Sequence, residues 1–579
     1  MKQITTLILL AAIYQLHAQE PLTPFEQSDY KACATYEEVI NYCKDLDNLH
    51  TQVNYSVFGK SGRFYDLPLL VIDKDGFTSP QLIRNAGRVI LMIQASIHSG
   101  EPDGTSAGLM FVRDIMQKPE MKDWLDNVSI LFIPVFNVDG YMRRSPFNRI
   151  NQNGPEEMGW RTNATNLNLN RDYLRAESPE MKAWHALYNL WVPDFFIDCH
   201  TTNGADYQYA ITYDLPIYGN MEKEQTTWMK EKYLNPLKKS MADAGYPMFR
   251  YVSFRKWHDH ESGLTTWVAS PMLAHGYTAV KNRPGFLIET HMLKSYDVRV
   301  WATYEALAKT MDILNRESNA LKKVNYLADV FTISNDFREN TYPLEWEATD
   351  EYSHVDFLGK TYTKEKSALT GGTYFKYGDK DTTHKMKFYD DLEPQKQVRI
   401  PRAIVIPPEW DEVIQRLDIH NIEYQRILQD TGFEVLQYMF DDVSFSSSPN
   451  EGAMHVSEFS LDSAMVKKSF PAQSVYIPLN QANAKVIMHL LHPEASSSML
   501  KWGYFNTIFE QKEYAEIYVM EQMAPEMLEN NPSLKKEFVQ WQKDNPTLQN
   551  EQWPVMNWFY KHSLYWDKQK NAYPPGFIF

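Results

Sequence analysis

The 579-residue sequence predicts an α/β protein: a mixed, largely parallel sheet with helices on both faces, followed by a C-terminal α+β region. Two observations predict the sheet. Short, continuously apolar runs recur along the first half of the chain, and helical patterns separate them. Strands buried on both faces have this apolar pattern, and parallel neighbours need a crossover that is usually a helix. A third observation, the change of texture after about residue 325, predicts the C-terminal region.

Four apolar runs are the expected strands of the sheet. They cover residues 89–95, 128–137, 194–200 and 286–290. Helical patterns at residues 105–116 and 178–190 lie between them. Alternating strands and helices are typical of a sheet with helices on both faces. We therefore assign residues 19–325 to one α/β domain.

The second half of the chain has a different texture. Residues 326–400 are rich in Thr, Tyr, Asp and Lys and lack a long helical period, which predicts a β-rich accessory segment. Residues 403–417 and 474–491 each have the pattern of a strand, an Ile-Pro step and a helix, and the tail from Trp502 is helical. We expect residues 401–579 to form an α/β and helical region that packs on the first domain.

Composition restricts the partners. The chain has 58 Lys and Arg against 74 Asp and Glu, a net charge of −16. An acidic surface repels phosphate, so nucleic acid is not an expected partner. Aromatic residues make up 14% of the sequence, which indicates large packed cores. Glycan binding by the aromatic second half remains an open alternative.

The first residues have the features of a secretory signal peptide. Lys2 precedes an apolar run at residues 4–13, and a small residue precedes a cleavage point at Ala18–Gln19. The run is too short to span a bilayer, and no later run is long enough, so no membrane span is expected. Residues 1–18 are therefore the predicted signal peptide of a secreted or periplasmic protein.

The chain contains three cysteines, Cys33, Cys43 and Cys199. A framework of disulfides therefore does not hold the fold together. A single bridge between Cys33 and Cys43 remains open.

Residues that suit a metal follow two of the expected strands. His98 and Glu101 come directly after the strand at residues 89–95, and His200 ends the strand at residues 194–200. Ligands of open α/β sheets lie at the carboxyl ends of the strands. Two histidines and one glutamate are a standard ligand set of catalytic zinc, which keeps a fourth position open.

A general base can be placed by the same rule. Glu289 lies at the carboxyl end of the strand at residues 286–290. A carboxylate at the end of an apolar strand is partly desolvated, which raises its pKa toward the range of a general base. The sequence therefore predicts two His and two Glu at three strand ends of one sheet.

Six short segments follow one another along the chain: HSGE (98–101), FNVDGY (136–141), GWRTN (159–163), NLNLNRDY (166–173), DCHTT (198–202) and FLIETH (286–291). As an ordered set, they resemble the zinc carboxypeptidase (carboxypeptidase A-like) family over about residues 50–310, in the form of its secreted bacterial members with a C-terminal accessory region. The resemblance implies an enzyme that hydrolyses the C-terminal bond of a peptide with a free carboxylate.

The resemblance also implies roles for single residues. His98, Glu101 and His200 would bind one zinc ion. Glu289 would deprotonate water and return the proton to the leaving amine. Arg161 would polarise the scissile carbonyl and stabilise its negative charge, as a preorganised cation can.

The resemblance implies three residues that bind substrate and one that contacts a zinc ligand. Asn170 and Arg171 would hold the terminal carboxylate, which fits the planar donor fork of a guanidinium. Tyr277 is the expected counterpart of the tyrosine that the family has before the base glutamate. Asn168 occupies the position where the family can carry an acidic group that orients a zinc histidine.

Two other functions remain open at this point. One is a zinc amidase or deacylase that cuts cell-wall or N-acyl amide bonds on the same fold. The other is a non-catalytic peptide- or glycan-binding protein on the same scaffold. The sequence does not specify the preferred terminal residue or the oligomeric state.

Overall fold

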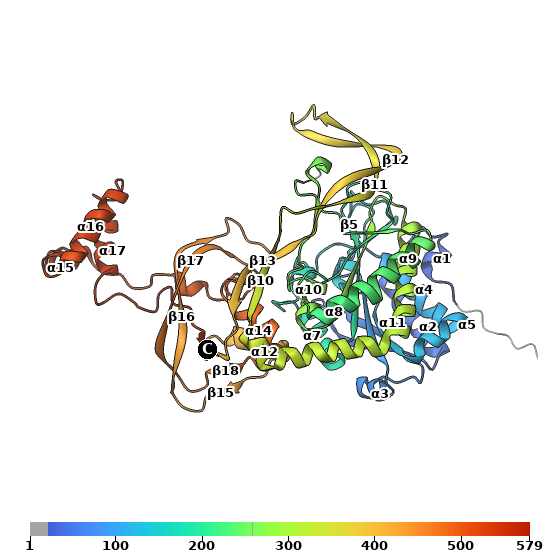
Figure 1. Cartoon of the computed structure of the whole chain (residues 1–579), viewed down its shortest axis with the longest axis horizontal. Coiled ribbons are helices and arrows are strands. Elements are labelled where there is room, and N and C mark those ends of the chain that lie inside the picture. The colour runs from blue at the N-terminus through green and yellow to red at the C-terminus, as the bar shows by residue number, and fades with distance from the viewer. Residues whose placement is uncertain (1–20, 220, 258) are drawn as a thin grey trace, which may run out of the picture.

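The computed structural model describes residues 21–219, 221–257 and 259–579 (Figure 1). The predicted signal peptide, residues 1–18, lies outside these ranges. Within the described residues, eight strands form the sheet of the N-terminal half. In spatial order these are β1 (Val53–Lys60), β2 (Asp66–Ile72), β4 (Val128–Ile133), β3 (Val89–Ala95), β5 (Phe195–Thr202), β9 (Gly285–His291), β6 (Ile211–Asp214) and β7 (Met248–Arg250).

The centre of this sheet is parallel and most of its margin is antiparallel. Strand β3 pairs in parallel with β4 and β5, and β5 pairs in parallel with β9. The pairs β1–β2, β2–β4 and β6–β9 are antiparallel, whereas β6–β7 is parallel. The predicted mixed, largely parallel sheet is confirmed, and its four central strands are the four apolar runs of the sequence.

Strand β3 explains why an apolar run predicts a central strand. Leu91 and Ile93 belong to one buried cluster, and Ile90 and Met92 belong to a second. Because successive side chains of a strand point to opposite faces, these are the clusters on the two faces of the sheet. Both faces are therefore buried, as a parallel sheet requires.

Helices cover both faces. On one face, helices α2 (Tyr36–Leu49), α4 (Asp103–Gln117) and α11 (Tyr296–Ile333) contribute to the first cluster. On the other face, α7 (Pro179–Trp191) and α10 (Ala274–Val280) contribute to the second. The shorter helices of this half are α1 (Pro24–Gln27), α3 (Pro80–Asn85), α5 (Pro119–Lys122), α6 (Val138–Tyr141), α8 (Lys223–Trp228) and α9 (Asn235–Asp243).

Helix α11 crosses residue 325, where the texture of the sequence changes. Leu321, Val324 and Ala328 are buried along one side of the helix, at spacings of three and four residues. The buried side thus continues past residue 325 to Thr332, and the helix ends at Ile333. The strand-rich part of the chain begins only after this helix.

The C-terminal half contains three sheets in the described residues. Strands β10 (Thr341–Ala348) and β13 (Leu392–Arg399) form a ribbon, and the long hairpin of β11 (Ser353–Lys366) and β12 (Thr373–Tyr389) pairs with β8 (Leu264–Thr265). Six strands form the third sheet, in the order β15 (Gln425–Arg426), β18 (Val475–Pro478), β14 (Ala403–Ile406), β19 (Gly576–Ile578), β16 (Thr431–Phe445) and β17 (Val456–Phe470).

The helices of this half pack in two separate places. Helices α13 (Asp411–Ile419) and α14 (Ala484–Leu491) share the second buried cluster with α7 and α10, so one apolar core joins the two halves. Helices α15 (Ile517–Asn530), α16 (Pro532–Asp544) and α17 (Gln552–Lys561) form a separate cluster that stands apart from the rest (Figure 1).

Two further expectations concern membranes and disulfides. None of the helices in the described ranges is long and apolar enough to cross a membrane. Cys33, Cys43 and Cys199 are all buried and free, so the bridge between Cys33 and Cys43 is not formed.

Candidate metal centre and catalytic cavity

The turn after β3 brings His98 and Glu101 together. The backbone N–H of Glu101 donates to the carbonyl oxygen of His98 at 2.9 Å, which closes a turn directly before α4. Residues three apart in such a turn project to the same side. Both side chains are buried at the carboxyl end of the strand.

The neighbouring strands bring His200 and Glu289 to the same place. His200 lies in β5, and its register partner in β9 is Glu289. Side chains of paired residues in adjacent strands project from the same face of a sheet. The carboxyl ends of β3, β5 and β9 meet at one edge, where open α/β sheets bind ligands.

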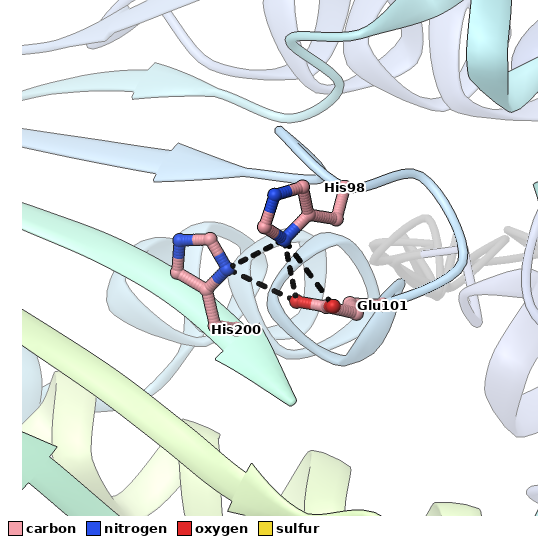
Figure 2. Close-up of side chains that lie close together, drawn as sticks. All are labelled: His98, Glu101 and His200. Carbon is pink, nitrogen blue, oxygen red and sulfur yellow. Dashed lines mark hydrogen bonds and ion pairs between the residues drawn. The ribbon is translucent and has the colours of Figure 1, made fainter. Parts of the chain in front are cut away.

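His98, Glu101 and His200 form a compact cluster (Figure 2). The Nδ1 atoms of the two histidines are 3.1 Å apart. Oε2 of Glu101 lies 3.0 Å from Nδ1 of His200 and 3.3 Å from Nδ1 of His98. Two ligands that are each about 2.0–2.1 Å from a tetrahedral zinc ion lie about 3.3 Å apart, so the cluster has the dimensions of a zinc site.

The outer nitrogens of both histidines have acceptors. Nε2 of His98 lies 3.0 Å from Oδ1 of Asn168, and Nε2 of His200 lies 2.8 Å from Oδ2 of Asp198. When the rings are neutral, these contacts favour the proton on Nε2 and leave both Nδ1 lone pairs facing Glu101. Two nitrogen lone pairs and a carboxylate that point toward one place are suited to bind a cation. The chemistry of these donor atoms therefore fits a metal ion.

The charges around the cluster agree with this fit. Burial disfavours charge on His200, but Asp198 and Glu101 raise its pKa well above the usual range. The surroundings therefore attract one positive charge to this point, which a metal dication supplies. Burial lowers the pKa of His98 to about 4, so this ring is neutral at pH 7 and available as a ligand.

Arg149 fixes the carboxylate of Glu101. Its Nη1 donates to Oε1 of Glu101 at 2.7 Å, and the backbone N–H of Thr201 donates to Oε2 at 3.0 Å. Burial acts to raise the pKa of Glu101, yet Arg149 and the two histidines hold it well below the usual range. Glu101 therefore stays ionised, as a metal-binding carboxylate must.

Glu289 borders the cluster as a carboxylate of altered acidity. Burial raises its pKa to about 8, with a further increase from the negative charge of Glu101. A carboxyl group whose pKa approaches the working pH is suited to accept and return a proton.

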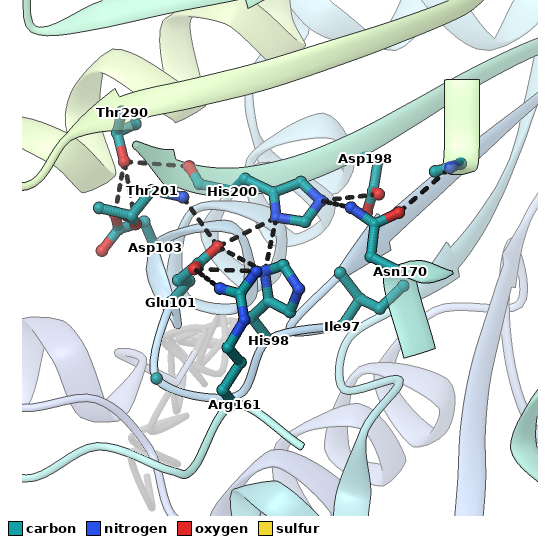
Figure 3. A network of polar contacts seen from close by, with 12 residues as sticks. Ile97, His98, Glu101, Asp103, Arg161, Asn170, Asp198, His200, Thr201 and Thr290 are labelled. Carbon is teal, nitrogen blue, oxygen red and sulfur yellow. Dashed lines mark hydrogen bonds and ion pairs between the residues drawn. The ribbon is translucent and has the colours of Figure 1, made fainter. Parts of the chain in front are cut away.

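The cluster forms the inner wall of a cavity of about 270 Å³. Arg161 and Arg171 line it together with Arg149 and Glu289. Nη1 of Arg161 lies 3.6 Å from Oε1 of Glu101 (Figure 3). Three guanidinium groups in one small cavity favour an anionic substrate.

A short segment supplies the two residues expected to hold a carboxylate. Asn170 and Arg171 both line the cavity. Oδ1 of Asn170 accepts from the backbone N–H of Ala274 at 3.1 Å, and its amide lies beside His200 and Asp198 (Figure 3). Nη1 of Arg171 donates to the carbonyl of Asn170 at 2.7 Å. Both side chains are thus held by contacts within the protein.

Tyr277 does not reach the cavity. It lies in α10 with a fully buried side chain, and its hydroxyl is 2.8 Å from Nδ1 of His420 in the C-terminal half. The expected substrate contact is therefore not present at this residue. The phenol that lines the cavity is that of Tyr251, whose hydroxyl donates to Oδ1 of Asn203 at 3.0 Å.

Sequence reasoning missed three residues of the site: Asp198, Arg149 and Tyr251. Asp198 carried a signal, because residues two apart in a strand point to the same face and Asp198 precedes His200 by two. Arg149 carried none, since an irregular loop brings it to the cavity. Tyr251 directly follows the short edge strand β7, which the sequence analysis did not predict.

A buried His–Glu–His cluster beside a carboxylate of raised pKa is the arrangement of a zinc-dependent hydrolase. Residues 39–303 match the family model described as zinc carboxypeptidase. This part of the chain, just under half of it, is thus similar to the zinc carboxypeptidase family.

Individual proteins similar to this chain are named as carboxypeptidases. Carboxypeptidase 2 of Trichophyton rubrum is 22% identical over 428 residues, which cover 71% of this chain and 73% of that protein. Carboxypeptidase 2 of Trichophyton tonsurans is 26% identical over 105 residues, 18% of this chain and 19% of that protein.

Solved structures of similar proteins include a metallo-carboxypeptidase from Burkholderia cenocepacia, with a TM-score of 0.37 and 15% identity over 49% of this chain and 70% of that chain. Carboxypeptidase A from Helicoverpa armigera has a TM-score of 0.36 and 16% identity over 52% of this chain and 75% of that chain.

Proposed function

We propose that this protein is a secreted zinc metallocarboxypeptidase that hydrolyses the C-terminal bonds of peptides. His98, Glu101 and His200 hold one zinc ion in this proposal. The observation that carries it is the convergence of two histidine Nδ1 atoms and a carboxylate within 3.3 Å of one another, with Glu289 paired in register with His200.

The residues divide the chemistry among them. When bound, zinc supplies a Lewis acid and lowers the pKa of its water to about 7. Glu289 accepts a proton from the attacking water at its carboxylate and returns it to the nitrogen of the leaving amino acid. Arg161 presents a fixed positive charge where the carbonyl oxygen becomes negative, an interaction worth several kcal/mol. Each of these groups lines the same cavity.

Substrate binding follows from the cationic wall of the cavity. Asn170 and Arg171 bind the terminal carboxylate, Asn170 through its amide and Arg171 through its guanidinium fork. The partner is therefore a peptide with a free C-terminus. The name carboxypeptidase in the similar Trichophyton proteins supports the same substrate class.

Peptides and their C-terminal amides test this binding mode. We expect kcat/KM for an N-blocked dipeptide to exceed that for its amide by about 10- to 150-fold, because a hydrogen-bonded charge contributes about 1.5–3 kcal/mol. The variant Arg171→Gln should reduce the rate on the free acid and remove most of this preference. Initial-rate kinetics measure both.

Arg316→Gln is the control, since Arg316 is an exposed arginine on α11. It should keep the preference of the unaltered protein. Equal rates on acid and amide would instead favour the zinc amidase.

Secretion completes the proposal. Residues 1–18 have the features of a signal peptide, so we infer cleavage between Ala18 and Gln19 and release from the cytoplasm. N-terminal sequencing of the protein from its native host should begin at Gln19. Intact Met1 in the mature protein would contradict this inference.

A further inference from the structure

The turn between β16 and β17 has an unusual residue at its tip. Asn450 and Ala453 exchange two backbone hydrogen bonds of 3.0 Å, which makes Glu451 and Gly452 the two central residues. Their φ angles are +48° and +75°. A turn with two positive φ angles favours Asn, Asp or Gly, and a glutamate there is uncommon.

The side chain of Glu451 reaches the catalytic half of the molecule. Its Oε2 accepts the backbone N–H of Asn168 at 2.8 Å. Its carbonyl oxygen accepts from Nη1 of Arg175 at 2.6 Å, and the guanidinium of Arg175 lies 4.7 Å from the ring centre of Trp502. The turn is therefore attached to both ends of the segment 168–175.

Asn168 connects this contact to the candidate metal centre. Its Oδ1 lies 3.0 Å from Nε2 of His98 and also accepts the backbone N–H of Asn170 at 3.0 Å. A shift of Asn168 would therefore move the group that orients His98. It would also move the segment that carries Asn170 and Arg171.

The charge of Glu451 also acts on this segment. Burial and the positive charge of Arg161 lower the pKa of Arg171, and the carboxylate of Glu451 opposes this shift. The carboxylate thus compensates part of the repulsion between the two cavity arginines. The cationic cavity gains this support from the C-terminal half of the chain.

We propose that Glu451 is a positioning residue of the active site, supplied by the C-terminal region, which fixes Asn168 for zinc binding and the segment 170–171 for binding of the terminal carboxylate. The strained glutamate at the turn is explained by this contact. The inference rests on the proposed carboxypeptidase function. It gives the C-terminal region a role in substrate affinity.

Glu451→Gly separates this role from a purely structural one. Glycine adopts positive φ without strain, so the turn should fold at least as well, with an unchanged or higher Tm. Without the carboxylate, we expect zinc affinity to fall by about 3- to 10-fold, below the 10- to 100-fold typical of direct partners of a metal ligand. KM for a free-acid peptide should rise by a similar factor, with a smaller change in kcat.

Two further variants complete the experiment. Glu451→Gln keeps an acceptor for the N–H of Asn168, so it should restore most of the zinc affinity. Asp442→Gly is the matched control, because Asp442 is an exposed acidic residue of β16 with a φ of +52°. It should leave zinc affinity and KM unchanged. Competition with a chromophoric chelator measures zinc affinity.

Hydrogen exchange of the zinc-free protein gives a readout that is independent of catalysis. Exchange of residues 168–171 should be faster in Glu451→Gly than in the unaltered protein or in Asp442→Gly. Unchanged exchange, zinc affinity and KM in Glu451→Gly would overturn the positioning role. Faster exchange in a protein that neither binds zinc nor cleaves peptides would instead contradict the proposed function alone.

Discussion

Replacement of Glu289 by glutamine is expected to lower kcat by roughly 10²- to 10⁴-fold while the protein keeps its zinc. The amide has nearly the shape of the carboxylate but cannot accept a proton from water. Because Glu289 is not one of the three clustered ligands, metal content should stay at one ion per chain. Steady-state kinetics and metal analysis of the same sample measure the two quantities.

A matched control is Glu120→Gln, an exposed glutamate on α5 (Pro119–Lys122). It should keep full activity. Full activity in Glu289→Gln would remove Glu289 from the mechanism. Loss of zinc in that variant would instead indicate that the carboxylate takes part in the metal site.

The same residue predicts the pH dependence. Burial raises the pKa of Glu289 from an ordinary value of 4.5 to about 8, and a bound dication would bring it down from there. Only the ionised carboxylate accepts a proton, so kcat/KM should fall as the pH drops through this pKa. The residual activity of Glu289→Gln should lack this acid limb. Measuring the zinc content at each pH distinguishes protonation of Glu289 from loss of the metal.

Removal of the metal is expected to abolish hydrolysis completely. A chelator takes away the Lewis acid, and the remaining groups of the cavity cannot polarise the peptide carbonyl to the same extent. Added Zn²⁺ should restore the rate. Zinc should also stabilise the folded protein, by about 4 kcal/mol at a concentration 1,000 times its Kd. Rates and thermal unfolding with and without chelator measure these effects.

His200→Ala tests whether this metal is the one in the cavity. It should lower zinc affinity so that added Zn²⁺ no longer restores activity. His354→Ala is the control, because His354 is an exposed histidine of β11. Retention of hydrolysis in His200→Ala, or in the chelated protein, would show that the cluster is not the catalytic centre.

Much of the site could be predicted from the sequence because ligands of open α/β sheets bind at the carboxyl ends of the strands. The run at residues 89–95 coincides with β3, and the runs that carry His200 and Glu289 lie in β5 and β9. Parallel neighbours bring their carboxyl ends together whatever the length of the crossover between them. Residues at these ends could therefore be placed without knowing how the rest of the chain folds.

Tyr277 shows where this reasoning stops. The resemblance to the zinc carboxypeptidase family made Tyr277 the expected substrate-binding tyrosine, but residues 274–280 form α10, which is buried between the sheet and the C-terminal half. The sequence interpretation also set the end of the first domain at residue 325, which lies inside the long helix α11.

Glu451 could not be found by any local pattern. It is 283 residues from Asn168, and only the packing of the two halves brings them within 2.8 Å. A turn residue with an unfavourable φ gives no signal in a single sequence. Contacts between two sheets depend on how the sheets are placed relative to each other. The hydrophobic periodicity of either sequence segment does not reveal this placement.

Anomalous X-ray scattering at the zinc edge, from crystals of the protein purified with its metal, tests the central claim most directly. We predict one peak about 2.0–2.2 Å from Nδ1 of His98, Nδ1 of His200 and a carboxylate oxygen of Glu101, with a fourth position open toward the cavity. A zinc peak elsewhere in the molecule, or none in protein that hydrolyses peptides, would contradict the account.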